Sequence, residues 1–181
     1  MSDTVIKDTV IKLADLVGKP AAKPEPFVLS DAEKHEIEHE LTHFPDGRAA
    51  SIEALKIVQK HRGWVPDAAL EPVAQLIGIT AAELEGVATF YSQIYRKPVG
   101  RHVVKVCDSI TCFLVGFEEI KAALEQQLGI GFGQTTADGR FTLLPICCIG
   151  ACDKGPALMV DDDLHYDLTP QNLATVLEAY K

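Results

Sequence analysis

Four of the five cysteines form two closely spaced pairs, and thiols grouped in this way are typical metal ligands. Cys107 and Cys112 have four residues between them, whereas Cys148 and Cys152 have three. Because 35 residues separate Cys112 from Cys148, two short loops can close around one centre. Four thiolates suit either a tetrahedral zinc ion or an iron–sulfur cluster.

The spacing within each pair helps to distinguish these chemistries. Structural zinc usually takes pairs with two intervening residues, and a thioredoxin-type dithiol needs that spacing at the start of a helix. Neither pair has it. A plant-type ferredoxin pattern also opens with a four-residue gap. The spacing therefore favours a two-iron cluster, while zinc and a redox dithiol stay open.

The residues beside the cysteines bear on how a centre would be held. Cys147 and Cys148 are adjacent, so only one is expected to bind the same metal, and the other is interpreted as a small buried hydrophobe. Gly150 allows a close turn around the centre. Ser109 and Thr111 are candidate hydrogen-bond donors to sulfur.

The elements that must position the cysteines lie in residues 99–181. Each pair follows an apolar strand, and parallel strands would bring both pairs to one sheet edge. The order β-α-β-β-α predicts a thioredoxin-like layer of sheet and helices. The expected elements are strands at His102–Cys107 and Phe141–Cys147, a helix at Gly116–Gly129, a hairpin at 157–168, and a last helix with Thr169 as N-cap and Pro170 at its first position.

The segment before this layer is predicted to be helical. Ser30 with Glu33, and Thr80 with Glu83, form capping boxes that start helices. Two further helices are expected to end at Gly63 and at Gly78, although Pro72 makes the start of the second uncertain. Residues 86–95 are expected to pack in the core, with a part facing a partner.

The chain thus divides into a tail and linker over 1–28, a helical bundle over 29–98 and a thioredoxin-like domain over 99–181, an α+β organisation. The tail repeats DTVIK and then carries a proline-rich stretch typical of a linker.

Composition restricts the function further. With a net charge of −9 the chain of 181 residues lacks the basic character of a nucleic-acid or anionic-membrane binder. It has no apolar run long enough to insert in a membrane and no signal-peptide layout, so a cytoplasmic protein is expected. In that compartment paired cysteines are metal ligands or redox groups more often than disulfides.

Other motifs carry less chemistry. The spacing of His35, His39 and His43 places them opposite the apolar side of the first helix, so they are interpreted as a solvated face. The glycine-rich Gly129–Gly133 is interpreted as a helix cap and loop, and residues 161–163 as a charged turn. No Ser/His/Asp or Cys/His catalytic set stands out.

Three longer segments resemble the E-subunit family of bacterial NADH:quinone oxidoreductase, or complex I. They are GWVPDAAL, GVATFYSQIYRKPVGRHVVKVCDSITC and FTLLPICCIGACDKGPALMV, and the similarity runs from about Phe27 to Lys181. The resemblance implies a helical N-terminal domain and a thioredoxin-like domain with one [2Fe–2S] cluster. By the family motif its ligands are Cys107, Cys112, Cys148 and Cys152, which leaves Cys147 as the spare.

The resemblance also implies partners and a role. An F subunit would carry FMN and NADH, with a larger G subunit nearby, in a peripheral arm on the cytoplasmic side of the inner membrane. The cluster would exchange single electrons with the flavin. Because reduction adds negative charge, Asp108 and Asp153 should lower the potential, and backbone amides with Lys105 or Lys154 should offset part of this effect.

Two alternative functions stay open. The same module serves NAD-linked hydrogenases and formate dehydrogenases as part of a diaphorase. A non-redox scaffold held by structural zinc is the alternative of another class.

Overall fold

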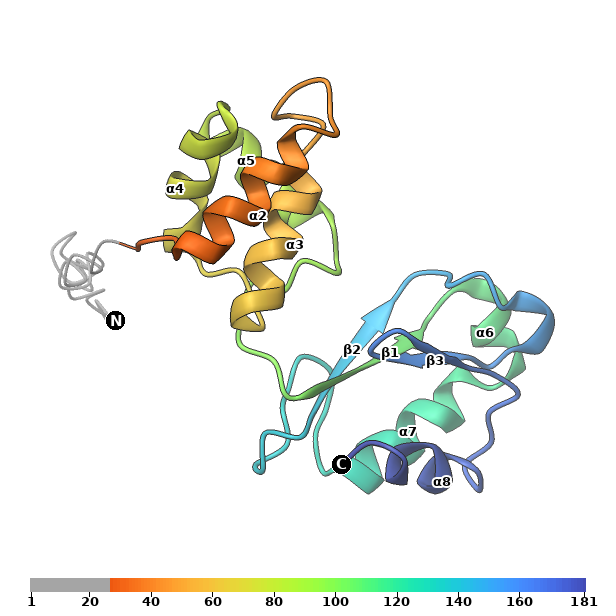
Figure 1. The fold of residues 1–181 in the computed structure, drawn as a ribbon. Helices are drawn as coiled ribbons and strands as arrows, with labels where there is room; N and C mark the ends of the chain where they lie inside the picture. The colour runs from red at the N-terminus through yellow and green to blue at the C-terminus, as the bar shows by residue number, and fades with distance from the viewer. Residues whose placement is uncertain (1–26) are drawn as a thin grey trace, which may run out of the picture.

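A computed structural model describes residues 27–181 of the chain, so the duplicated DTVIK and most of the predicted tail lie outside the described residues. Four helices come first, followed by a part that mixes strands and helices (Figure 1). The elements are α2 (Asp31–Leu41), α3 (Ser51–Arg62), α4 (Asp67–Ile77), α5 (Ala81–Phe90), β1 (His102–Cys107), α6 (Ile110–Val115), α7 (Phe117–Leu128), β2 (Phe141–Ile146), the 3-10 helix η1 (Cys152–Lys154), β3 (Leu158–Val160), β4 (Asp163–His165) and α8 (Leu173–Glu178).

Local capping determines where the first helices begin. The Ser30 hydroxyl accepts the Glu33 backbone N–H at 3.2 Å, and the Glu33 carboxylate accepts the Ser30 N–H at 2.7 Å. Thr80 and Glu83 repeat this reciprocal arrangement at the start of α5. Each pair satisfies amides that have no partner inside the helix. Both predicted capping boxes are confirmed.

Glycine ends two helices, as predicted. Gly63 closes α3 with φ +80° and Gly78 closes α4 with φ +77°, in the left-handed region that residues with a Cβ avoid. Pro72 lies inside α4 and does not set its start. The helix begins after Pro66, whose fixed φ of −68° leads the chain into it.

Residues 86–95, which include the end of α5, are only partly core. Ala88 and Ile94 are buried, but Phe90 and Tyr91 stack edge to face at the surface, and Phe90 is 79% exposed. Apolar side chains from all four helices form one cluster, in which Leu55, Val58 and Leu84 are fully buried.

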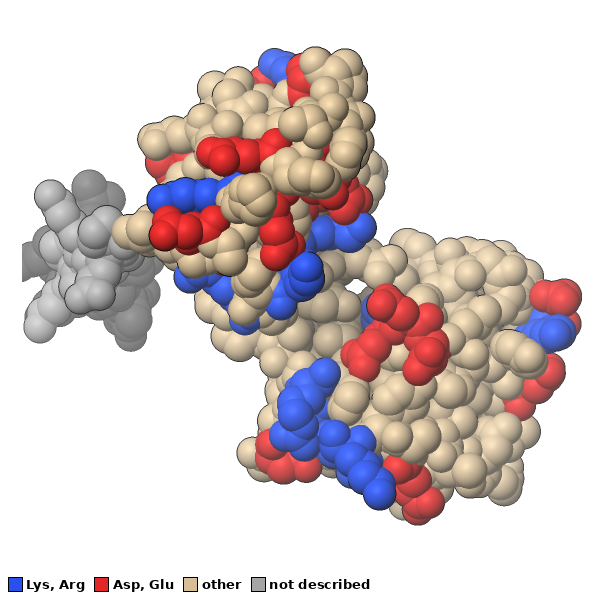
Figure 2. Space-filling view, viewed as in Figure 1, with Lys and Arg blue, Asp and Glu red and all other residues tan. Residues whose placement is uncertain are grey.

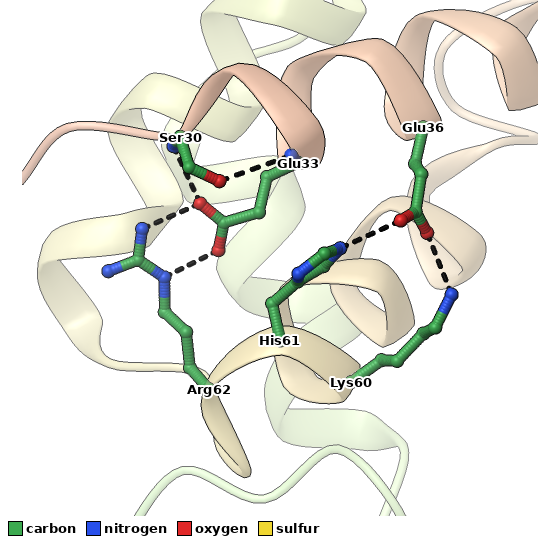
Figure 3. A network of polar contacts seen from close by, with 6 residues as sticks. All are labelled: Ser30, Glu33, Glu36, Lys60, His61 and Arg62. Carbon is green, nitrogen blue, oxygen red and sulfur yellow. Dashed lines mark hydrogen bonds and ion pairs between the residues drawn. The ribbon is translucent and has the colours of Figure 1, made fainter.

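An ion-pair network joins α2 to α3 at their surface (Figure 3). Glu36 accepts from Lys60 at 3.0 Å and contacts His61 at 2.9 Å. Beside it, Glu33 is almost fully buried and pairs with Arg62. Lys and Arg alternate with Asp and Glu over the helical part of the face in Figure 2, so the described residues form no extended basic surface on that side.

The second part is built on a four-stranded sheet with the order β2-β1-β3-β4. β1 and β2 are parallel, whereas β3 is antiparallel to β1 and β4 is antiparallel to β3. Helices α7 and α8 lie on one side of this sheet (Figure 1). Val104 and Leu143 on the strands pack with Leu124 of α7 and Leu173 of α8 in a buried cluster. This arrangement of sheet and helices matches the predicted layer.

Two details differ from the sequence-based expectations. The last helix begins at Leu173 rather than after Thr169. The predicted cap is present, since the Thr169 hydroxyl accepts the Asn172 N–H and the Asn172 side chain accepts the Thr169 N–H, but it holds a turn that precedes the α-helix. The second difference is α6, which follows β1 directly where a loop was expected.

No single helix among residues 27–181 has the length and apolar character needed to cross a bilayer. The pair α4 and α5, bent by 119°, satisfies the criteria of length and composition only when its two members are taken together.

Candidate metal centre

The two cysteine pairs meet at one edge of the sheet. Cys107 is the last residue of β1 and Cys112 lies in α6. Cys148 follows the end of β2, and Cys152 is the first residue of η1. Because β1 and β2 are parallel, with Cys107 paired to Ile146, both chains leave the sheet in the same direction. The predicted convergence of four thiols is present.

Each pair is in contact, and the pairs act on each other. The Cys148 and Cys152 sulfurs are 3.3 Å apart. The Cys112 thiol is hydrogen-bonded to Cys107, and it lies close enough to Cys152 for the charge of Cys152 to raise its pKa. The charge of Cys107 in turn contributes to the raised pKa of Cys152. Two pairs of thiols close enough to affect each other match the requirement of a centre with two thiolates on each side.

The pKa values of the thiols follow from their surroundings. Burial, followed by the hydrogen bond with Cys107, raises the pKa of Cys112 to about 11. The Gly150 amide lowers the pKa of Cys148, whereas the hydrogen bond with Cys148 raises that of Cys152. Four thiolates would therefore repel one another, and a positively charged metal centre between them would stabilise their deprotonated state. The donor set fits a thiolate-bound metal.

Backbone and hydroxyl groups supply hydrogen bonds to the sulfurs. The Gly150 N–H is 3.4 Å from the Cys148 sulfur, and the Ala157 N–H donates to Cys112. The Thr111 hydroxyl donates to Cys152 and offsets part of the rise in the pKa of that thiol. Thr111 thus acts as predicted, whereas Ser109 makes no side-chain bond at the start of α6.

The chain returns close to the sulfurs at Gly155, a position that no sequence motif marked. A Cβ there would lie 3.4 Å from the Cys112 sulfur and 2.9 Å from Val115 Cγ2. Ala151 and Ala157 are small and buried in the same cluster as Cys107 and Cys112. The one sequence signal for these small residues beside the sulfurs is their run around the second cysteine pair. Gly150, at φ +85°, makes the turn that was expected.

The centre is enclosed on one side only. Cys107 and Cys112 are each 2% exposed, while Cys148 and Cys152 are exposed. Helix α6 flanks the site and presents four large apolar side chains to solvent, namely Ile110, Phe113, Leu114 and Val115. An exposed apolar surface of this kind is typical of a contact with another protein.

Two expectations for this region are corrected. Cys147 is exposed, so its interpretation as a buried hydrophobe is wrong; β2 ends at Ile146 and strand alternation does not reach it. The predicted charge offset by Lys105 or Lys154 stays a prediction. Lys105 Nζ contacts Gln93 at 3.3 Å, and Lys154 lies over the Tyr166 ring.

The second correction is that Cys112 belongs to a helix and not to a loop. The acidic turn itself is as predicted: Asp161 accepts from the Val103 N–H at 2.8 Å and contacts His102 at 2.7 Å.

Comparisons with known proteins agree with this architecture. The family model of the thioredoxin-like [2Fe-2S] ferredoxin matches residues 37–181. The E subunit of NADH-quinone oxidoreductase from Pseudomonas aeruginosa is 62% identical over 154 residues, covering 85% of this chain and 93% of the relative. Its counterpart from Escherichia coli K12 is 61% identical over 157 residues, covering 87% and 95%.

Among solved structures, an NAD+-reducing [NiFe]-hydrogenase in the air-oxidized state matches with a TM-score of 0.57 at 22% identity. The match covers 68% of this chain and 22% of the hydrogenase chain, and it shows a shared fold. The family model and the near full-length relatives go further: this chain belongs to the thioredoxin-like [2Fe-2S] ferredoxin family, in the group of NADH-quinone oxidoreductase E subunits.

Proposed function

We propose that this chain is an electron-transfer subunit of a respiratory NADH:quinone oxidoreductase. One observation carries the proposal: four thiols converge at one sheet edge in a chain that is 62% identical to the Pseudomonas aeruginosa relative over nearly the whole length of that protein. Cys107, Cys112, Cys148 and Cys152 would hold one [2Fe–2S] cluster, which supplies a one-electron redox centre when bound.

The residues of this chain have three tasks in that function. The four cysteines fix the position of the centre, and the Gly150, Ala157 and Thr111 donors stabilise negative charge on sulfur. The buried side, at Cys107 and Cys112, excludes water. The open side, beside the apolar surface of α6, leaves a short path for an electron to a docked protein.

The partners belong to the proposal as well. An F subunit with FMN and NADH would exchange single electrons with the centre, and a G subunit would lie nearby. The chain would then lie in the peripheral arm, on the cytoplasmic side of the membrane. The division at about residues 28 and 98 into tail, helical domain and thioredoxin-like domain is also part of the proposal, and the two separate buried clusters support it.

The decisive experiment is anaerobic purification of the full chain with iron and sulfide analysis and EPR. We expect two irons and two sulfides per chain, no signal in the oxidised protein and a rhombic S = 1/2 signal after dithionite. Stoichiometric zinc without a signal, in protein never exposed to air, would support the non-redox scaffold and contradict electron transfer.

A second experiment separates complex I from a diaphorase module, which the similarity in fold to a hydrogenase leaves as the alternative. The tagged chain is isolated from its own cells and the copurifying proteins are identified by mass spectrometry. Membrane subunits of a quinone reductase are expected. Hydrogenase or formate dehydrogenase subunits in their place would establish the alternative.

A further inference from the structure

The C-terminal end of α2 gathers three metal-binding groups far from the cysteine site along the chain. His39 and Glu40 lie in its last turn and His43 lies just beyond it. One ligand atom from each residue lies within 4.8 Å of the other two. The two imidazole rings are 4.9 Å apart and nearly perpendicular. His39 and His43 are exposed, as the sequence predicts for this face, and exposure also makes both rings accessible to an ion from solvent.

The backbone fixes this arrangement. The Thr42 N–H bonds to the carbonyls of His39 and Glu40, and the His43 N–H bonds to the Glu40 carbonyl at 2.9 Å. The Thr42 hydroxyl adds a bond of 2.7 Å to the His39 carbonyl. The chain therefore keeps turning through His43, which brings this ring back beside that of His39. His43 Nδ1 is already 3.4 Å from a Glu40 carboxylate oxygen.

The electrostatic surroundings favour a cation. The C-terminal end of a helix carries partial negative charge from the helix dipole, and Glu40 adds a full charge. His39 and Glu40 line a surface hollow together with Lys56 and Lys60 of α3. The two ammonium groups are paired with Glu53 at 2.9 Å and with Glu36 at 3.0 Å. Repulsion of an incoming cation is reduced by these pairs.

We propose that His39, Glu40 and His43 form a binding site for a divalent transition-metal ion. Two imidazole nitrogens and one carboxylate oxygen suit zinc, nickel or copper, whereas magnesium and calcium prefer oxygen ligands throughout. Three protein ligands leave coordination positions for water or for a group of another protein. His35, one turn earlier in the same hollow, lies near enough along the helix to act as an outer neighbour.

The test is calorimetric titration of Ni(II) into the full chain with its four-cysteine site loaded. A Cys147→Ser background removes the exposed free thiol as a competitor. One Ni(II) per chain is expected, with affinity reduced at least about tenfold in His39→Asn and in His43→Asn. His61→Asn is the matched control, because His61 lies on α3 and contacts Glu36 instead, and it should bind as the parent does.

A second readout locates the ion directly. Paramagnetic Ni(II) should broaden the ring resonances of His39 and His43 before those of the other histidines. Parent-like affinity in both Asn variants, or broadening centred on a different histidine, overturns the proposal, as does a parent chain that binds no Ni(II).

Discussion

The two carboxylate oxygens of Glu33 both face the guanidinium of Arg62, with Nε 2.5 Å from Oε1 and Nη2 2.6 Å from Oε2. Glu33 is 1% exposed, and the same carboxylate caps the start of α2 through Ser30 (Figure 3). Arg62 also donates to the Val28 carbonyl and stacks on the Phe27 ring. One buried carboxylate thus fastens the entry of the chain, the start of α2 and the end of α3.

This pair makes the helical part sensitive to acid. The hydrogen bonds with Arg62 lower the pKa of Glu33 from 4.5 to about 2. Stability from this group is fully present above pH 4.5 and is lost as the pH falls toward 2, on the order of 3 kcal/mol. The free energy of unfolding, measured with urea at pH 7 and at pH 3, should fall less between these two pH values in Glu33→Gln than in the parent. Glu53→Gln, which removes an exposed pair, should follow the parent; equal losses in all three proteins would contradict the assignment.

The adjacent cysteines give a direct test of the ligand set. Cys148 contacts Cys152 at 3.3 Å, whereas Cys147 makes no sulfur contact among the described residues. Cys148→Ala should therefore abolish normal cluster assembly, and Cys147→Ala should leave iron content and the reduced EPR signal unchanged. Loss of iron in the Cys147 variant alone would show that the ligand assignment is wrong.

The charge beside Cys152 should set the potential of the centre. Asp153 is the next residue of η1, and its carboxylate disfavours the negative charge that reduction adds. Asp153→Asn should raise the midpoint potential in an EPR-monitored redox titration, by tens of millivolts where about 59 mV corresponds to a tenfold change. An unchanged or lowered potential counts against the electrostatic account.

Thr111 should raise the midpoint potential, the opposite of the effect expected for Asp153. Its hydroxyl donates to the Cys152 sulfur, and such a bond strengthens as negative charge accumulates. Thr111→Val keeps the shape and removes the donor, so the midpoint potential should fall in the same titration. Ser109→Ala is the control, because the Ser109 hydroxyl makes no side-chain capping bond. This variant should leave the midpoint potential unchanged.

Two glycines of the helical part should respond oppositely to alanine. A Cβ on Gly47 would lie 1.7 Å from the Ile77 carbonyl oxygen, so Gly47→Ala should destabilise the fold by at least about 1–3 kcal/mol. Gly86 lies inside α5 with open space around it, and Gly86→Ala should stabilise the fold by about 0.5–1 kcal/mol. Thermal unfolding of both variants checks the pair, and a shift of the same sign in each would refute the packing argument.

Local signals were sufficient for most elements of this fold. The capping boxes at Ser30 and Thr80 and the left-handed glycines at Gly63 and Gly78 act within a few residues, so the sequence around each one contains the whole cause of these helix ends. The parallel arrangement of β1 and β2 followed from two buried strands joined by a helix. It was enough to predict that the four thiols converge.

What could not be predicted depends on contacts that are distant in sequence. Helix α6, with the sequence ITCFLV, has no polar face and no capping side chain, so no periodic pattern marks it as a helix. Its position follows from Cys112 packing against Gly155, which lies 43 residues later in the chain. The exposure of Cys147 likewise depends on where β2 ends, a boundary that pattern alone does not define.

Because the site combines cysteines that follow β1 with cysteines that follow β2, it cannot be complete until both segments have been synthesised. Cys152 is added to the growing polypeptide forty residues after Cys112. At roughly 5–20 residues per second, ribosomal synthesis leaves the first two thiols without the second pair for roughly 2–8 s. Metal delivery must therefore await a chain extended beyond residue 152, and the seconds before that point are when a competing thiophilic ion could occupy the half-formed site.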